Sequence, residues 1–534
     1  MIRKSIFYFA LLFFACTAWT GERPNIVFIM SDDQGWGDVG YHDPALYTPH
    51  IDRLSAEGIR LQQHYVHPQC TPTRVALLTG RYPSRFGPHA TYAGGNDQSI
   101  PYETPTLASL LKSAGYETAL IGKWHLGSVP SQGPQHWGFD YSYGCLAGGC
   151  DNYTHLYKKA ANNPYAHTWH RNGELIPDSE HGELHEAGKH TTDLLTQDAM
   201  RFIHQEREKP FFLYLAHTAP HTPLQEEEKW FNDPEGKLAK LDPERRLFAA
   251  VLHHLDDGIG QVAQALKDSG QWENTLVIFS SDNGSVEGSN GPLRSKKTHV
   301  YEGGIRVPAW VSWPARLEPG SIDHPMHVTD WLPTLCRLAG LETLPENLDG
   351  TDMFPLFQGR AVSRDFYWTW GVRMFPQPRR AVRIGDWKLV QESSGNQEGE
   401  WELFDLSKDP NETSNLAGQH PERVESLRAF LDQQQQLDAK APMPSFWIDV
   451  PNTAEAGKPI LGRLNCSRKM ALAAPMLNIE GAELVSFGEV ESSELRGVVS
   501  SASFELNPTT GLVRVSVIAG DTHPGSMPFQ IQIR

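Results

Sequence analysis

The chain has 534 residues and a formal net charge of −17 at pH 7, and its 39% hydrophobic and 21% charged residues are ordinary values for a globular protein. This composition excludes a disordered, collagen-like or disulfide-knot protein. The acidic balance and the lack of a long Lys/Arg run argue against nucleic acid or an anionic membrane as a partner, so a bound anion would need a local site.

The N-terminus has the pattern of a secretory signal peptide, which we predict over residues 1–20. Arg3 and Lys4 precede the apolar run Ile6 to Ala15, which is too short to span a bilayer. We therefore expect a secreted or periplasmic protein that does not span the membrane. Cleavage after this run is the preferred interpretation. Lipid attachment at Cys16 is the alternative, although the residues before it make a poor lipobox.

Cysteine usage is sparse for an exported protein. The chain has six cysteines, so an odd number remains when Cys16 is set aside. Cys145 and Cys150 are near enough in sequence to form a disulfide, and the sequence alone leaves this open.

Beyond the signal, short apolar runs alternate with helical patterns. The runs are continuous and rich in β-branched residues, which is typical of strands buried on both faces of a sheet. They are Asn25 to Met30, Thr118 to Ile121, Phe211 to Leu215, Thr275 to Phe279 and Val307 to Val311. The predicted helices are Thr106 to Ala114, Asp193 to Glu208, Arg245 to Lys267 and Val328 to Ala339. This alternation predicts an α/β fold with a mainly parallel sheet between two layers of helices.

Polar residues that could bind a ligand or take part in catalysis follow several of these strands. In parallel sheets, ligands bind beyond the carboxyl ends of the strands. Four predicted strands end in such residues: Asp32 and Asp33, Lys123 and His125, His217 and His221, and Asp282 and Asn283. We therefore expect these side chains to meet at one edge of the sheet.

Two further regions follow the α/β part, which is expected over residues 22–360. Residues 361–440 contain short β-like pieces and a helical pattern from Pro421 to Gln435, which predicts a small antiparallel sheet with one helix. Ala441 to Pro444 has the composition of a linker. Residues 445–534 show strand-like alternation without clusters of charged residues or histidines, and we expect them to form a separate β-sandwich-like accessory module.

One local motif predicts an anion site. In Cys70-Thr71-Pro72-Thr73-Arg74, the proline before an apolar run marks the first turn of a helix. Cys70 then lies at the helix N-terminus with Arg74 one turn in, where backbone N–H groups and a guanidinium favour an anion. Taken alone, the segment is equally compatible with a buried structural cysteine.

Several motifs in order make the chain resemble the type I sulfatases. CTPTR, beginning at Cys70, is followed by LLTGR, with SDDQGWGD upstream and GKWHLG and SSDNG downstream. The family signature is Cys-x-Pro-x-Arg, whose cysteine a maturation enzyme oxidises to formylglycine (3-oxoalanine), an aldehyde that hydrates to a geminal diol. The resemblance covers roughly residues 23 to 430 and implies an alkaline-phosphatase-like fold. Within the family it is strongest to the arylsulfatase B (N-acetylgalactosamine-4-sulfatase) branch.

The strand-end carboxylates predict a metal site. Asp32, Asp33, Asp282 and Asn283 offer only oxygen ligands, which suit a hard cation such as Ca²⁺ or Mg²⁺ rather than zinc. The resemblance implies that these residues and the modified Cys70 hold one metal ion, usually Ca²⁺. Asp32 and Asp33 alone would be read more simply as a helix cap or a turn. The buried strand before them and the second acidic pair argue for the metal.

The resemblance also assigns the basic residues. Arg74 and Lys123 would bind sulfate and diol oxygens, and Lys297 matches the second sulfate-binding lysine. His125 would take the proton of the diol's second hydroxyl. Lys123 and His125 are two residues apart, so an extended segment would project both to the same side.

The implied mechanism needs a general acid, because the alcohol of a sugar sulfate is a poor leaving group. The His-x-Pro pattern favours His221 over His217. The remaining roles for His217 are to orient the substrate or to pack against its neighbours. One diol hydroxyl, deprotonated by Asp282, would attack sulfur while His221 protonates the leaving oxygen, giving a covalent sulfo-enzyme. His125 would then deprotonate the second hydroxyl, and sulfate would leave as the aldehyde re-forms.

We therefore expect an exported sulfatase acting on a sulfated carbohydrate, such as glycosaminoglycan or algal-type polysaccharide fragments. The sequence leaves open which sugar is bound and whether four aromatic residues stack on it or pack in the core: Tyr92, Trp137, Tyr153 and Trp169. One alternative is a phosphodiesterase or phosphonate-ester hydrolase of the same superfamily, which often carries extra His/Asp metal ligands. The other is a catalytically dead protein that binds sulfated glycans, as an unmodified Cys70 would imply.

Overall fold

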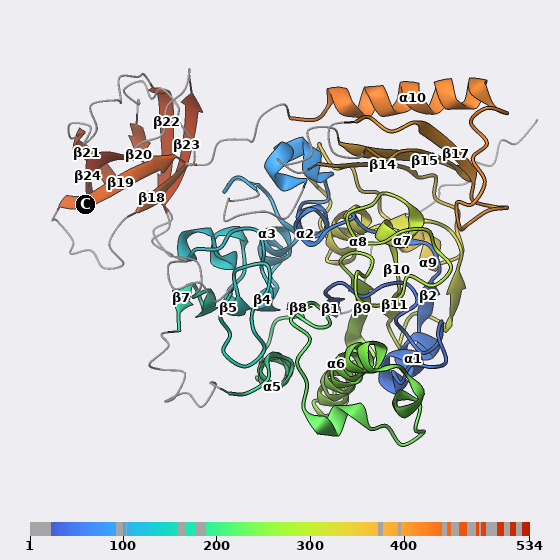
Figure 1. Ribbon diagram of the computed structural model, residues 1–534. Helices are drawn as coiled ribbons and strands as arrows, with labels where there is room; N and C mark the ends of the chain where they lie inside the picture. The colour runs from blue at the N-terminus through green and yellow to red at the C-terminus, as the bar shows by residue number, and fades with distance from the viewer. Residues whose placement is uncertain are drawn as a thin grey trace, which may run out of the picture.

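The computed structural model describes residues 23–439 except 92–99, 103, 158–166, 177–187, 372–377 and 394–396, and beyond them the backbone of strands β18 to β24. The predicted signal peptide, with Cys16, lies outside the described residues, as does Tyr92. A ten-stranded mixed sheet forms the centre, in the order β12-β2-β11-β9-β1-β8-β4-β5-β6-β7 (Figure 1). Every helix in the described part is too short or too polar to span a bilayer.

The middle of the sheet is parallel, as the apolar runs predict. β1 (Asn25–Ser31) lies between β8 (Phe211–Ala216) and β9 (Thr275–Ser281). β4 (Glu117–Gly122) and β5 (Tyr141–Cys145) continue the parallel part beyond β8. All residues of β8 and β9 are buried, which explains why their sequences are continuously apolar rather than alternating. The polar residues that follow β1, β4, β8 and β9 therefore reach the same edge.

The run Val307 to Val311, predicted as one strand, is two. β10 (Arg306–Val307) pairs with β3 (His64–Tyr65) in a small sheet that also contains β13 (Met326–His327). β11 (Ala309–Ser312) instead joins the main sheet, antiparallel to β9. Pro308 lies between them, and because proline has no N–H it interrupts the ladder. The remaining strands of the main sheet are short: β2 (Ile59–Leu61), β6 (Trp169–Arg171), β7 (Glu174–Leu175) and β12 (Gly320–Ile322).

Helices cover both faces of the sheet (Figure 1). In β1, Ile26, Phe28 and Met30 join one apolar cluster, whereas Val27 and Ile29 join the other, because successive side chains of a strand point to opposite faces. The first cluster lies under α2 (Cys70–Thr79), α3 (Leu107–Ser113) and α8 (Trp331–Leu338), and the second under α1 (Pro49–Glu57), α5 (Thr191–Ile203) and α6 (Pro243–Asp268).

One helix is shorter than predicted. The pattern Asp193 to Glu208 suggests a longer helix, but α5 ends at Ile203. The guanidinium of Arg207 folds back and donates a hydrogen bond to the carbonyl of Phe202 at the C-terminal end of the helix. The other helical segments described in the α/β part are single turns: α7 (Glu302–Ile305), α9 (Phe354–Phe357), and the 3₁₀ turns η1 (Pro83–Phe86), η2 (Pro88–Ala90), η3 (Pro130–Gln132), η4 (Pro134–Trp137), η5 (Glu228–Phe231), η6 (Leu238–Lys240), η7 (Trp272–Asn274) and η8 (Val328–Asp330).

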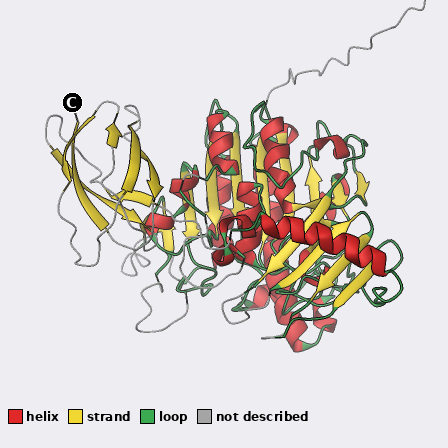
Figure 2. Cartoon of the chain, turned by 90° about the horizontal axis from the view of Figure 1, so that it is seen from above, coloured by secondary structure: helices red, strands yellow, loops and turns green. Residues whose placement is uncertain are grey.

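A small antiparallel sheet follows the α/β part, as predicted. It consists, in order, of β14 (Asp365–Trp370), β15 (Arg379–Ile384), β16 (Trp387–Gln391) and β17 (Trp401–Asp405). Helix α10 (Pro421–Gln436) lies across this sheet in Figure 2, and its buried residues Leu427 and Leu431 pack on Val382, Leu389 and Leu403.

A buried group of charged side chains joins the small sheet to the α/β part. Lys388, on β16, places its ammonium 2.8 Å from a carboxylate oxygen of Glu302 and 2.8 Å from one of Glu412. The hydroxyl of Tyr65 donates to the other oxygen of Glu302, at 2.7 Å. Burial raises the pKa of Glu412 to about 7 against the opposing charge of Lys388. Glu302 begins α7 in the α/β part, so the group spans both regions.

The C-terminal strands form two sheets, with the orders β18-β19-β24-β21 and β20-β22-β23. This all-β content agrees with the alternation seen in the sequence. Their bounds are β18 (Phe446–Asp449), β19 (Pro459–Cys466), β20 (Leu477–Ile479), β21 (Ala482–Phe487), β22 (Val499–Leu506), β23 (Val513–Ala519) and β24 (Ser526–Ile533).

Candidate active site

The residues predicted for a metal site lie together at the carboxyl edge of the sheet. The backbone N–H of Asp33 donates to Oδ1 of Asp282 at 3.1 Å, and the amide of Asn283 donates to Oδ1 of Asp33 at 2.7 Å. One oxygen each of Asp32 and Asp282 and the sulfur of Cys70 lie within 4.8 Å of one another. Segments more than 200 residues apart in sequence are thus brought to one point, because β1 and β9 are neighbours.

Helix α2 positions Cys70 and Arg74. It begins at Cys70, as the Pro72 motif predicts, and all its residues are buried. The Arg74 guanidinium donates to Oδ2 of Asp282 from Nη2 at 2.8 Å and from Nε at 3.2 Å. Its Nη1 donates to the carbonyl of Lys123 at 3.0 Å and to the hydroxyl of Tyr214 at 3.4 Å. Arg74 therefore connects the helix to the ends of three strands.

Two lysines face the carboxylates. Nζ of Lys123 lies 2.6 Å from Oδ2 of Asp32, and Nζ of Lys297 lies 2.5 and 2.7 Å from the two oxygens of Asp33. Burial favours a neutral amine, but the charge of Asp32 outweighs it and raises the pKa of Lys123. The pKa of Lys297 is raised in the same way, against burial, by the negative groups around it. Both side chains are therefore cationic and suited to binding an anion.

The carboxylates respond differently to the same surroundings. Burial opposes ionisation of Asp32, but Lys123 and the other nearby cations hold the pKa of Asp32 well below its usual range. Burial, helped by the charge of Asp32, raises the pKa of Asp282 to about 7, although Arg74 opposes this shift. Burial also raises the pKa of the Cys70 thiol.

The donor set fits a hard divalent cation. Among the described residues, Oδ1 of Asp32 and Oδ1 of Asn283 are buried without a hydrogen-bond partner. A buried acceptor left in this way costs about 1–3 kcal/mol, and a cation would satisfy both. The oxygens of these two residues and of Asp33 and Asp282 are the ligands that Ca²⁺ and Mg²⁺ prefer.

His125 faces the same pocket, but not for the reason that the sequence suggests. Its φ of 56° is left-handed, so the segment from Lys123 is not extended. The ring lies against Gly148, where an added Cβ would come within 2.4 Å of Nε2. Burial, with the charges of Lys123 and Arg74, lowers the pKa of His125 well below its usual value. The ring is therefore neutral, and it is a weaker base than an exposed histidine.

The structure separates the two histidines that compete as general acid. His221 is half-buried, with Nε2 3.7 Å from Oδ2 of Asp33, and its Nδ1 bonds to the carbonyl of Thr222 at 2.6 Å. Nε2 therefore faces the acidic cluster. His217 is fully buried, and neither ring nitrogen has a hydrogen-bond partner within the described structure. Burial lowers the pKa of both rings, that of His217 to about 3, so it is the position of Nε2 facing the acidic cluster that favours His221.

Left-handed backbone is concentrated around this pocket. Asp33, His125, Ser295 and Thr298 have φ values of 64°, 56°, 71° and 73°. Each lies in a segment that contributes a side chain to the site, the last two flanking Lys297. Non-glycine residues rarely adopt this conformation, and those that do are enriched at functional sites.

Some residues of the site were not anticipated. Gly148 and Gly149 line the pocket beside His125 and His221, and a glycine pair is a recognisable signal for close packing. The small sheet also reaches the site, since Nε1 of Trp370 donates to Oε1 of Gln69, the residue before Cys70. No sequence pattern indicates that contact.

Other open questions from the sequence have answers here. Cys145 and Cys150 are both buried and free, not disulfide-bonded. Trp137 and Trp169 are core residues, 1% and 2% exposed, so they do not stack on a sugar. Tyr153 is half-buried and its ring packs against that of His190.

The fold is the alkaline-phosphatase-like sulfatase fold. The crystal structure of Ps i-CgsB covers 79% of this chain and 94% of its own, with a TM-score of 0.70 and 30% sequence identity. The same protein has been solved in complex with k-i-k-neocarrahexaose, with the same degree of similarity.

The chain belongs to the sulfatase family, whose model matches residues 24–341. A second model, described as N-sulphoglucosamine sulphohydrolase, C-terminal, matches residues 295–439. Among curated relatives, arylsulfatase J of Mus musculus is 32% identical over 78% of this chain and 77% of its own length. The N-acetylgalactosamine-6-sulfatase of Homo sapiens is 35% identical over 65% of this chain and 68% of its own length. The protein is thus a sulfatase, an enzyme that hydrolyses sulfate esters.

Proposed function

We propose that this sulfatase is exported and removes sulfate from a sulfated carbohydrate, using formylglycine made from Cys70 and one bound Ca²⁺. The observation that carries the proposal is the convergence of Asp32, Asp33, Asp282 and Asn283 on Cys70. The sugar substrate is supported by the relatives, which include an N-acetylgalactosamine-6-sulfatase and a protein solved with a neocarrahexaose.

The first task of the site is to bind sulfate. Lys123 is a fully buried cation and Lys297 a half-buried one, and both would neutralise sulfate oxygens, as developing negative charge requires. Arg74 holds Asp282 beside residue 70. The metal, held by the four oxygen donors, would add a fixed positive charge.

The second task is to move protons. A hydrated aldehyde at position 70 would supply a hydroxyl nucleophile and, after sulfate transfer, a second hydroxyl for release. Asp282 would accept the proton of the first hydroxyl. His221 would donate a proton from Nε2 to the leaving alcohol, and neutral His125 would accept the last proton. His217 would support the loop rather than titrate.

Export and domain organisation complete the proposal. Residues 1–20 would direct export and be removed, with lipid attachment at Cys16 as the alternative. The catalytic domain would span residues 22–360, with the small-sheet subdomain at 361–440 and the accessory module at 445–534. A formylglycine-generating enzyme would modify Cys70 in the producing cell.

The test combines mass spectrometry with a substrate screen. Protein from a host with a maturation enzyme should contain the aldehyde at residue 70, and it should release sulfate from sulfated galactose or N-acetylgalactosamine oligosaccharides. A C70A variant provides the matched control. Unmodified thiol in active protein would contradict the chemistry, and turnover of no sulfated sugar would contradict the substrate class. Preference for an aryl phosphate over the matched aryl sulfate would favour the phosphodiesterase alternative.

A further inference from the structure

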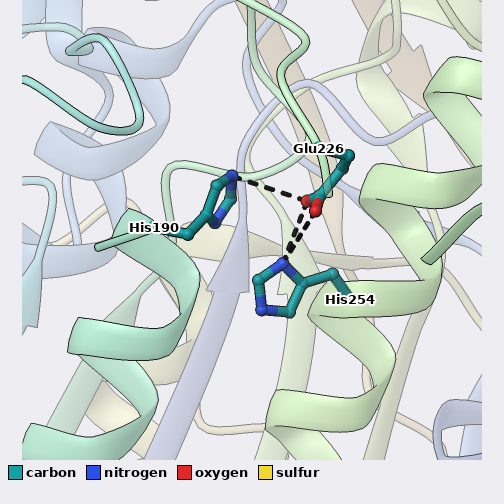
Figure 3. A group of neighbouring side chains, drawn as sticks. All are labelled: His190, Glu226 and His254. Atoms are coloured by element: carbon teal, nitrogen blue, oxygen red, sulfur yellow. Dashed lines mark hydrogen bonds and ion pairs between the residues drawn. The ribbon is translucent and has the colours of Figure 1, made fainter. Parts of the chain in front are cut away.

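A second cluster of histidines and carboxylates lies outside the sulfate pocket. His254, on α6, directs Nδ1 at the two carboxylate oxygens of Glu226, at 3.0 and 3.1 Å, and Nε2 at Oδ1 of Asp193, at 3.2 Å. His190 also approaches this carboxylate, with 3.5 Å between Nε2 and Oε1, and its ring centroid lies 4.7 Å from that of His254 (Figure 3). The side chains of His254 and Glu226 are 2% and 0% exposed.

The cluster has the composition of a zinc site, but His190 does not fit that role. Its Nδ1 accepts a hydrogen bond from the backbone N–H of Thr192 at 3.2 Å. Nδ1 is therefore unprotonated, so in the neutral ring Nε2 carries the hydrogen and donates it to the carbonyl of Gln225, at 2.9 Å. Both nitrogens are in use, and the cluster lacks a third metal ligand.

The arrangement instead suits a charged His254. Each ring nitrogen faces a carboxylate, and only an imidazolium donates from both. The ring also stacks on Trp230, with centroids 4.2 Å apart and planes at 15°, which favours a cation. Burial and the nearby His190 and His217 oppose the charge.

The two carboxylates outweigh that opposition. Although burial acts against it, the hydrogen bonds to Asp193 and Glu226 raise the pKa of His254. Burial lowers the pKa of His190, which leaves that ring neutral beside the charged one. Lys229, exposed on η5, also faces Asp193. Asp193, Glu226 and His254 are called the His254 clasp below.

The clasp holds the segment that carries His221. This segment, residues 217–226, leaves β8 at His217 and ends at Glu226. Its penultimate residue, Gln225, is fixed as well, because Nε2 donates to Oδ2 of Asp151 at 3.0 Å and Oε1 accepts from the N–H of Asn152 at 2.9 Å. His221 therefore lies between two anchored ends.

We propose that His254 is a positioning residue for the sulfatase reaction: its imidazolium clasps Glu226 and so fixes segment 217–226 with His221 facing Asp33 in the candidate active site. The inference rests on the proposed role of His221 as general acid. A misplaced acid slows reactions with poor leaving groups, which need the proton, and spares those with good leaving groups, which do not.

The experiment measures kcat and KM for a series of sulfate esters of rising leaving-group pKa, from nitrophenyl sulfate to a sugar sulfate. The variants are H254Q, H221A and, as matched control, H253Q, whose histidine neighbours His254 on α6 but bonds to the carbonyl of Trp230 instead of Glu226. We expect H254Q to lower kcat about tenfold for the sugar sulfate and less than about twofold for nitrophenyl sulfate. H221A should show the same trend more strongly, and H253Q should match the wild type.

Failure of the positioning role of His254 and failure of the general-acid role of His221 would give different kinetic results. A steep leaving-group dependence in H221A with a uniform loss in H254Q would overturn the positioning role alone. A flat dependence in H221A would overturn the proposed role of His221 itself. If H254Q does not fold, E226Q tests the same clasp from the other side and should show the same steepening. Stoichiometric zinc in the purified wild type that is lost in H254Q would also overturn the inference.

Discussion

Arg74 donates two hydrogen bonds to a single oxygen of Asp282, although 208 residues separate them in sequence. Both side chains are completely buried. Arg74 lies one turn into α2 and Asp282 directly follows β9, so the pair fastens the helix that carries Cys70 to the sheet that carries the acidic cluster. The ion pair is therefore structural as well as electrostatic.

Removal of this guanidinium should destabilise the protein. R74A leaves the Asp282 carboxylate buried without its partner, and we expect a loss of about 3–5 kcal/mol in the free energy of unfolding, measured by urea denaturation. R74K should recover only part of this loss, because the lysine ammonium keeps the positive charge but does not reproduce the two hydrogen bonds of the guanidinium. The control R53A removes an exposed pair with Glu57 and should change stability by less than about 1 kcal/mol. Equal effects of R74A and R53A would contradict the argument.

Divalent cations should stabilise the folded protein. Ca²⁺ at a hundredfold excess over its Kd would add about 3 kcal/mol to the free energy of unfolding, and chelation should reverse this and abolish turnover. N283A removes one of the orphaned acceptors and should raise the Ca²⁺ concentration needed for half of the Tm shift. A Tm that does not respond to Ca²⁺, Mg²⁺ or chelator would rule out a metal held by these residues.

A methyl group at position 148 should disturb His125 specifically. The added Cβ of G148A would lie 2.4 Å from Nε2 of His125, so the ring must move. A displacement of this size at a catalytic group costs about a hundredfold in rate. We expect kcat to fall, with a burst of alcohol release before the slow steady state, because in the proposed mechanism His125 acts after the leaving group departs. G149A is the control, since its Cβ would lie 3.5 Å from Nδ1 of His221, an ordinary contact.

The His254 clasp should make stability depend on pH in a defined direction. The pKa of His254 is raised in the folded state above the ordinary 6.5. The contribution of the clasp to the free energy of unfolding is therefore complete below pH 6.5, and it is lost as the pH rises through the folded-state pKa of His254. H254Q should therefore be less stable than the wild type by about 2 kcal/mol near pH 6, and by less at alkaline pH. Chemical denaturation across this range checks the sign. A difference that grows with pH would show that His254 is neutral in the folded protein.

The sequence predicted the strand ends well because burial on both faces leaves a clear mark. Asp32 and Asp282 directly follow β1 and β9, which begin as continuous apolar runs, and parallel pairing then brings the two residues together. The break at Pro308 was visible in principle, since proline cannot donate to a ladder. The left-handed turn at His125 was not, because non-glycine residues adopt it only under tertiary constraint.

The His254 clasp also lay beyond sequence reasoning. Its residues come from α5, from the loop after β8 and from the middle of α6, with separations of 61 and 28 residues from His254. Periodicity shows which side of a helix is buried, but it does not say which polar group on another element will meet a buried histidine. Such partners emerge only when the helices are packed.

The salt-bridged lysine of the small sheet limits how the enzyme can be rebuilt. Lys388 pairs with Glu302, and the apolar cluster beside this pair takes residues from both regions, so a version cut after residue 360 would expose Tyr65 and Ile305 and remove the buried cation from Glu302. A graft from another sulfatase would need to bring a cation to the same spot. The two regions are therefore expected to be inherited, exchanged and engineered as one piece.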